Sequence, residues 1–196
     1  MSTKAAFFAF SFFLGFGTPV FSALDLGRPA GASPYEPYMR PVKQVLGSLN
    51  GNGASMDRVK GLLREGKSFR YSFTEPYVAA SPSVTAKTRS GDCKAKSLWL
   101  CNELGDCSVR YVIGKARNTS KISHAWVMWN DGARWWILDP TNSSRPIAAE
   151  SISPNEYIPF YSYDRNGCYR HAATQIFMAN AGTGGKPQVA GEKTKR

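Results

Sequence analysis

The chain has few acidic residues and few histidines, and these shortages argue against several kinds of site. It contains 14 Asp and Glu against 25 Lys and Arg, a net charge of +11, and only 2 His among 196 residues. The acidic residues form no cluster typical of a calcium-binding loop. The 4 cysteines include no C-x-x-C pair, which argues against a zinc site built from them and His124. We therefore expect no metal and no cofactor.

Long apolar runs are also missing, apart from one near the start. Residues 5–14 are apolar or small, follow the single basic residue Lys4, and are too few to cross a bilayer. Val20 and Ser22 fit the small-residue rule for cleavage before Ala23. We predict a signal peptide at 1–22, export to the periplasm or beyond, and no membrane span after cleavage. An uncleaved membrane anchor is the alternative.

The positive charge lacks the pattern of a nucleic-acid-binding protein. Basic residues are scattered and form no recognisable binding module, so we expect no nucleic-acid partner. The net charge falls from +11 to +10 when Lys4 leaves with the signal peptide. Such a charge favours acidic substrates or anionic envelope surfaces, although a solubilising charge with a basic tail is the simpler explanation. The sequence indicates no oligomeric state.

The strongest local signal is a hairpin over residues 124–139. Asp131-Gly132 separates two aromatic-rich apolar runs, which is typical of a two-residue type I′ turn. If the residues flanking this turn pair with each other, His124 lies directly opposite Asp139. Opposed side chains lie about 5 Å apart on one face, close enough for the carboxylate to accept the imidazole N–H. We therefore predict a His–Asp pair, on the face of the hairpin that turns toward the helix with the nucleophile.

A candidate nucleophile, Cys93, begins a predicted helix. Gly91 permits a sharp turn into this helix, apolar residues recur in it at helical spacing, and Gly105 ends it. The positive end of the helix dipole and a nearby imidazolium favour the thiolate form of such a cysteine. Backbone amides of the first turn also help to bind an oxyanion, with a second donor from elsewhere in the fold.

These elements resemble the transglutaminase-like superfamily of papain-type cysteine enzymes. The resemblance covers about residues 85–145, with Gly-x-Cys opening a helix, His-Ala-Trp on a strand, and Trp-x-x-Leu-Asp-Pro-Thr after a short hairpin. It implies an α+β fold in which a catalytic helix packs against an antiparallel β-sheet. It also implies Cys93 as nucleophile, His124 as general base and acid, and Asp139 as orienting carboxylate.

The implied reaction is acyl transfer on amide bonds through a thioester on Cys93. We favour hydrolysis of a peptide or protein by a cysteine peptidase or amidase, because a cross-linking protein-glutamine γ-glutamyltransferase needs an acceptor site that excludes water. Two alternatives are a non-catalytic module that binds an envelope peptide, and acyl transfer from a thioester cofactor, as in arylamine N-acetyltransferases. No recognisable nucleotide-binding sequence supports the second of these.

The chain divides without internal repeats. We predict an extended segment at 23–55 with one short helix, a transglutaminase-like catalytic domain at 56–180 that starts with a second helix, and a disordered basic tail at 181–196. Strands are expected at 68–73 and 108–113, where apolar and polar residues alternate.

The three other cysteines leave an odd thiol if Cys93 is free. Cys107 and Cys168 lie near predicted strand starts and form the candidate disulfide, whereas Cys101 is expected to be buried on a helix flank. The second histidine, His171, has no carboxylate partner set by local register. We expect it to be a surface or structural residue.

Overall fold

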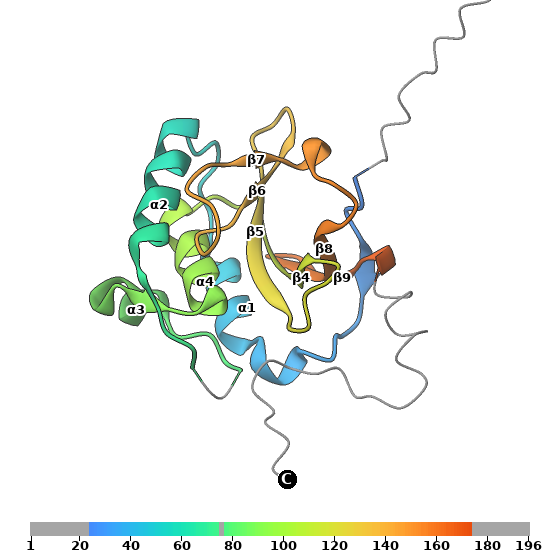
Figure 1. Ribbon diagram of the computed structural model, residues 1–196, viewed down its shortest axis with the longest axis horizontal. Helices are drawn as coiled ribbons and strands as arrows, with labels where there is room; N and C mark the ends of the chain where they lie inside the picture. Colours follow the sequence, from blue (N-terminus) through green and yellow to red (C-terminus); the bar gives the residue numbers. More distant parts are fainter. Residues whose placement is uncertain (1–23, 75–76, 174–196) are drawn as a thin grey trace, which may run out of the picture.

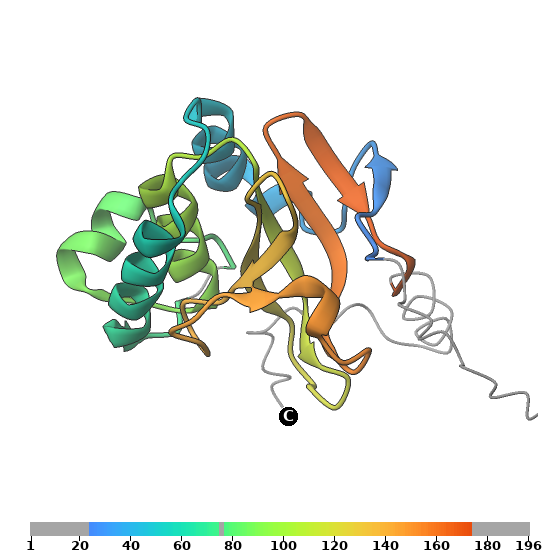
Figure 2. The same cartoon turned by 90° about the horizontal axis from the view of Figure 1, so that it is seen from above.

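A computed structural model describes residues 24–74 and 77–173, which form an α+β fold (Figure 1). The helices of this part are α1 (Arg40–Ser48), α2 (Met56–Ser68), α3 (Pro82–Thr88) and α4 (Cys93–Leu104), with short 3₁₀ turns at Glu36–Tyr38 and Ala149–Ser151. Figure 2 shows the helices on one side of the main sheet. The expected fold class, a helix packed against an antiparallel sheet, is confirmed.

The main sheet has seven strands, all joined by antiparallel pairing. Across the sheet they run β1 (Arg28–Ala30), β9 (Gly167–Arg170), β8 (Glu156–Asp164), β4 (Val109–Arg117), β5 (His124–Asn130), β6 (Trp135–Leu138) and β7 (Ile147–Ala148). A separate parallel pair joins β2 (Arg70–Tyr71) to β3 (Ser90–Gly91). The short β3 leads directly into α4.

The central helix is α4, which the other three helices and β5 contact. Asp92 caps its N-terminus by accepting the Ala95 N–H at 3.1 Å, and Gly105 ends it at φ 66°, in the left-handed region that glycine adopts without strain. Its buried polar side chains have partners: Lys96 Nζ donates to Phe69 O at 2.6 Å, and Ser97 Oγ donates to Ala125 O at 3.0 Å. The helix predicted from Cys93 to Gly105 is confirmed.

The two faces of the sheet bury two separate apolar clusters. The larger cluster lies between sheet and helices, and the smaller one lies on the opposite face and includes Val112, Trp126, Met128 and Ile137. Alternation along β5 divides its residues between them, since strand side chains point to opposite faces in turn. Both faces of β5 are therefore buried.

The strand expected at 68–73 is confirmed only at Arg70–Tyr71, where the two-residue β2 lies, and the rest of the prediction is wrong because α2 continues to Ser68. Phe69 turns inward against Trp99, with ring centroids 4.7 Å apart. Tyr71 and Phe73 remain 52% and 45% exposed. The alternating apolar residues that predicted a half-buried strand therefore do not form a buried face.

The strand expected at 108–113 is confirmed as β4, which extends further, to Arg117. The pairing of β4 with β8 shifts register between Ile113 and Gly114. A Cβ on Gly114 would lie 2.1 Å from the carbonyl oxygen of Ile158, so the close approach of the two backbones at this bulge requires glycine.

His171 links the two ends of the described chain. It is buried, its Nδ1 donates to Asp25 O at 3.0 Å, and its Nε2 accepts from Ser162 Oγ at 2.9 Å. Asp25 also accepts the Ala172 N–H at 2.7 Å. The structural role expected for this histidine is confirmed, and it is not a surface residue.

The predicted signal peptide at 1–22 and the predicted tail at 181–196 lie outside the described residues. Within 24–74 and 77–173, no helix is long and apolar enough to span a bilayer. All four cysteines lie in this part of the chain and are free, so the candidate disulfide between Cys107 and Cys168 is wrong. The Cys107 thiol instead contacts Asn52 Oδ1 at 2.8 Å.

Candidate active site

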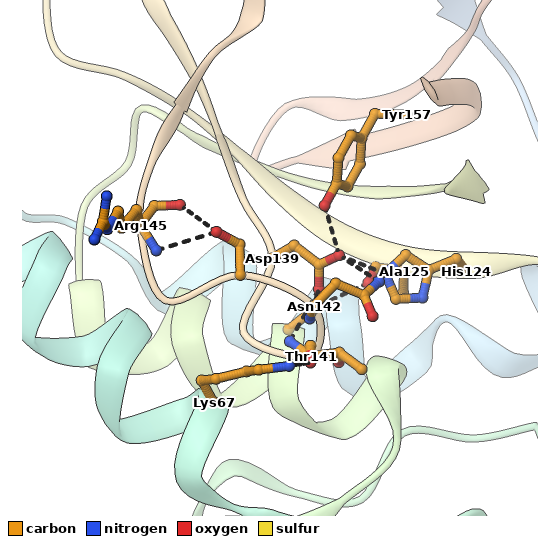
Figure 3. A network of polar contacts seen from close by, with 10 residues as sticks. Lys67, His124, Ala125, Asp139, Thr141, Asn142, Arg145 and Tyr157 are labelled. Atoms are coloured by element: carbon orange, nitrogen blue, oxygen red, sulfur yellow. Dashed lines mark hydrogen bonds and ion pairs between the residues drawn. The ribbon is translucent and has the colours of Figure 1, made fainter. Parts of the chain in front are cut away.

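The three residues expected to form a site come together at the ends of three elements. Cys93 is the first residue of α4, His124 is the first residue of β5, and Asp139 directly follows β6. His124 Nε2 lies 2.8 Å from Asp139 Oδ2, and the carboxylate is fully buried (Figure 3). The Cys93 side chain lies beside the same imidazole and contributes to raising its pKa. The chain therefore contains a contiguous thiol–imidazole–carboxylate arrangement.

The hairpin register that predicted the His–Asp pair is nevertheless wrong by two residues. Asn130 pairs with Trp135, so the connection is the four-residue loop 131–134. A type I′ turn needs positive φ at both central residues, but Gly132 has it (φ 93°) and Asp131 does not. The Asp131 carboxylate accepts the N–H groups of Ala133 and Arg134, each at 2.8 Å, and so builds the longer loop.

The expected pair survives this error because side chains alternate along a strand. A shift by two residues leaves each side chain on its original face. His124 and Asp139 therefore still share a face, although they meet diagonally rather than directly opposite each other.

The prediction that the His124 face of the hairpin turns toward α4 is also wrong for most of β5. Trp126 and Met128, which share a face with His124, lie in the cluster remote from the helices, whereas Ala125 and Val127 face the helices. His124 reaches the thiol because it stands at the very start of β5. The bond from Ser97 Oγ to Ala125 O holds the first turns of α4 against this strand end.

Electrostatics favour a charged imidazole in this site. Burial opposes the charge on His124, but the hydrogen bonds and negative charges of Asp139 and Cys93 outweigh it and raise the pKa of His124 to about 10. Burial likewise opposes ionisation of Asp139, yet the bond and charge of His124 and the N–H groups of Thr141 and Asn142 lower its pKa. At neutral pH the imidazolium is thus the favoured form of His124.

Two further side chains complete the environment of the carboxylate, and sequence reasoning missed both. Tyr157 Oη donates to Asp139 Oδ2 at 3.0 Å, and Asn142 Nδ2 donates to the same oxygen at 2.8 Å (Figure 3). Asn142 has a local signal, because an Asp three residues earlier accepts backbone N–H groups in a tight turn. Tyr157 has none, because only the long-range pairing of β8 with β4 brings it here.

A buried ion pair lies next to the thiol along the chain. Lys94 binds Asp92, and both side chains are almost fully buried. Thr74 Oγ1 also donates to Asp92 Oδ2, at 3.2 Å, and the Lys94 ammonium lies 4.8 Å from the centre of the Tyr77 ring. These contacts attach Thr74 and Tyr77 to the start of α4.

The described residues offer no alternative metal centre, since no group of three or more His, Cys, Asp or Glu is arranged to hold an ion there.

No protein-family model matches this chain, and no curated protein matches it. Among solved structures, LapG of Legionella pneumophila aligns with a TM-score of 0.49 at 16% identity, over 70% of this chain and 81% of LapG. The calcium-bound form of LapG aligns with a TM-score of 0.48 at 18% identity, over 65% of this chain and 74% of LapG. A Cytophaga hutchinsonii structure described as a candidate cysteine protease aligns with a TM-score of 0.35 at 16% identity, over 74% of this chain and 61% of that protein.

Proposed function

We propose that this protein performs thiol-dependent acyl transfer on amide bonds, as a cysteine peptidase or amidase that hydrolyses a peptide or protein. The observation that supports this most is the 2.8 Å hydrogen bond between His124 and the buried Asp139, with Cys93 beside the same ring. A nucleophile, a base and an orienting group in contact are the requirements for covalent catalysis by a thiol.

In the proposed mechanism Asp139 engages Nε2 of His124, which leaves Nδ1 for the thiol. The Cys93 thiolate attacks the amide carbonyl carbon, and a C–S bond forms. The imidazolium then gives its proton to the leaving nitrogen as the C–N bond breaks. A water molecule next loses a proton to the imidazole and attacks the thioester; the C–S bond breaks, the carboxylic acid leaves, and the Cys93 thiolate and the imidazolium are restored.

The start of α4 supplies donors for the oxyanion of this reaction. The first N–H groups of a helix have no partner within the helix. The cap uses the N–H of Ala95, and Lys96 N bonds to Asp92 O. The N–H of Cys93 is then well placed to stabilise the negative oxygen, because it belongs to the residue that carries the nucleophile.

We further propose that the enzyme acts outside the cytoplasm after removal of residues 1–22. The support is the basic residue, the apolar run and the small residues before Ala23. Mass spectrometry of the protein recovered from the periplasm or medium tests this, since the mature chain should begin at Ala23.

The test of the catalytic proposal is the pH dependence of alkylation by iodoacetamide, with mass mapping of each cysteine. Cys107 is the internal reference, because it is more exposed than Cys93 and its thiol contacts Asn52 instead. We expect Cys93 to react rapidly below pH 7 and Cys107 to react slowly there. His124→Ala should slow Cys93 about tenfold or more and leave Cys107 unchanged. A Cys93 that reacts no faster than Cys107 at pH 6 would rule out an activated thiolate.

The acceptor is tested with a peptide library and a labelled primary amine. New peptide N-termini that disappear in Cys93→Ser protein support hydrolysis. Incorporation of the amine into glutamine side chains, without cleavage, would instead assign cross-linking and contradict the hydrolytic proposal.

A further inference from the structure

A basic surface lies beside the site, where α2 faces the loop that follows β6. Lys60, Arg64 and Lys67 are spaced by four and three residues, so they lie along one face of α2. Lys67 Nζ donates to Thr141 O at 2.7 Å (Figure 3), and the Thr141 N–H donates to Asp139 Oδ1 at 2.9 Å. This face of α2 is therefore attached to the turn that positions the carboxylate of the site.

Next to this attachment lies a cavity of about 510 Å³, which we call the basic cleft. Its lining includes Met56, Trp136 and Pro146 together with three cationic residues, Lys60, Arg64 and Arg145. No acidic residue lines it. The basic cleft thus combines an apolar floor with concentrated positive charge.

The cations of the basic cleft are largely unpaired. Neither Arg64 nor Arg145 makes a side-chain hydrogen bond or ion pair with a described residue. Lys60 has only a 3.9 Å contact with Asp57, whose side chain is 97% exposed. Like charges gathered in one place repel each other, and an anionic ligand relieves that repulsion. Arginine guanidinium groups in particular bind carboxylates through two parallel hydrogen bonds.

The apolar part of the basic cleft argues for a peptide rather than a simple ion. Trp136 is half-buried, and its Nε1 is already used by Asp131 at 2.8 Å, so the ring offers contact area rather than a donor. Met56 adds an adaptable apolar side chain. An inorganic anion would use the arginines but not these two residues.

We propose that the basic cleft binds an acidic segment of the peptide substrate, with an apolar side chain against Trp136 and Met56. The proposal extends the function proposed above, since it names the class of substrate that the same enzyme selects. The cleft is lined by Arg145 and Pro146, which belong to the loop that follows Asp139, so it lies on the same loop as the carboxylate of the site.

The test measures binding of a labelled ten-residue peptide of alternating Glu and Leu to Cys93→Ser protein, by fluorescence anisotropy at low salt. The variant Arg64→Glu/Arg145→Glu is compared with Arg40→Glu/Arg165→Glu, which replaces two exposed arginines elsewhere and changes the net charge equally. We expect Kd to rise about tenfold or more in the first variant and less than about threefold in the second.

Three results would overturn the proposal. Equal weakening in both variants would mean that only the overall charge attracts the peptide. Equal binding of a Gln and Leu peptide would remove the need for acidic side chains. Complete displacement by inorganic phosphate at a concentration matching that of the peptide would indicate a simple anion site.

Failure of this proposal is separable from failure of the catalytic one. The binding assay uses a protein without the nucleophile, and the alkylation assay needs no substrate. A peptide that binds to a protein whose Cys93 is not activated contradicts only the catalysis, and an activated Cys93 with no binding contradicts only the basic cleft.

Discussion

At the scale of single residues, the property most sensitive to mutation is the protonation of His124. Its raised pKa depends on two anionic partners that overcome the cost of burial. Asp139 is the partner that remains charged whether or not the thiol has reacted. The charge of this carboxylate, more than its shape, therefore keeps the proton on the imidazole.

Asp139→Asn should lower the pKa of His124, because the charge is lost and burial then dominates. With less imidazolium, the alkylation rate of Cys93 at pH 6–7 is expected to fall about tenfold or more, since one pKa unit corresponds to a tenfold change in population. The rate measured from pH 5 to pH 9 checks this.

Tyr157→Phe is the matched control, because it removes one hydrogen bond to Asp139 and leaves the charge. It should lower the free energy of unfolding by about 1 kcal/mol and change the alkylation rate less than about threefold. Equal losses of rate in the two variants would contradict the assignment to charge.

Residue identities were predictable where a short pattern carries its own physical reason. Cys93 could be placed at a helix start because Gly91 permits the turn into the helix, apolar residues follow at helical spacing, and Gly105 is a good stop. His124 and Asp139 could be paired because a hairpin brings them together. Tyr157 could not be found, because its place depends on β8 crossing to β4, and no local pattern encodes that pairing.

At the scale of elements, the position of α2 depends on the close approach of Gly66 to Pro140 and Trp99. A Cβ on Gly66 would lie 2.8 Å from both Pro140 Cβ and a Trp99 ring carbon. Pro140 follows Asp139, so α2 packs directly against the turn of the site. The missing side chain at Gly66 thus sets the distance between this helix and the active-site loop.

Gly66→Ala should therefore lower the free energy of unfolding by about 1–3 kcal/mol, because overpacking outweighs the gain in helix propensity. Gly61→Ala, in the same helix, meets nothing within 4 Å and should raise it by about 0.5–1 kcal/mol. Urea unfolding of the two variants measures the contrast. Stabilisation by both substitutions would show that α2 can move away from Pro140 without cost.

Elements were predictable in type but less so in length. The alternation at 68–73 is real, but α2 extends into it, because Phe69 is buried against Trp99 at the end of the helix. The Asp-Gly signal at 131–132 correctly indicates a hairpin but not its loop, because the Asp131 side chain can accept two backbone N–H groups and stabilise a longer connection.

At the scale of the whole molecule, the two histidines give stability opposite dependences on pH. The pKa of His124 is raised to about 10, so its contribution is full below pH 6.5 and is lost as the pH rises toward 10. Burial lowers the pKa of His171, with the charge of Asp25 opposing this. The unfolded chain then binds a proton that the folded chain does not, so stability falls as the pH drops below 6.5.

We therefore expect the free energy of unfolding to be greatest near pH 6.5. Urea unfolding from pH 5 to pH 10 measures it, with His124→Ala flattening the alkaline limb and His171→Asn flattening the acid limb. The lowered pKa of Asp139 acts in a separate window, because that contribution is present above pH 4 and lost below it. A His171→Asn protein that keeps the full loss between pH 6.5 and pH 5 would contradict this assignment.

The exposed loop 131–134 has a consequence for how this chain can vary. Insertions or deletions of two residues at this tip keep the inward and outward identity of every position on β6, so Asp139 stays on the same face as His124. A single-residue insertion keeps this arrangement only if the loop lengthens or a bulge absorbs it, because a one-residue slip in the pairing of β6 with β5 would move the carboxylate to the opposite side. Length changes at the tip of this hairpin thus matter for the site through the strand pairing that they leave intact or shift.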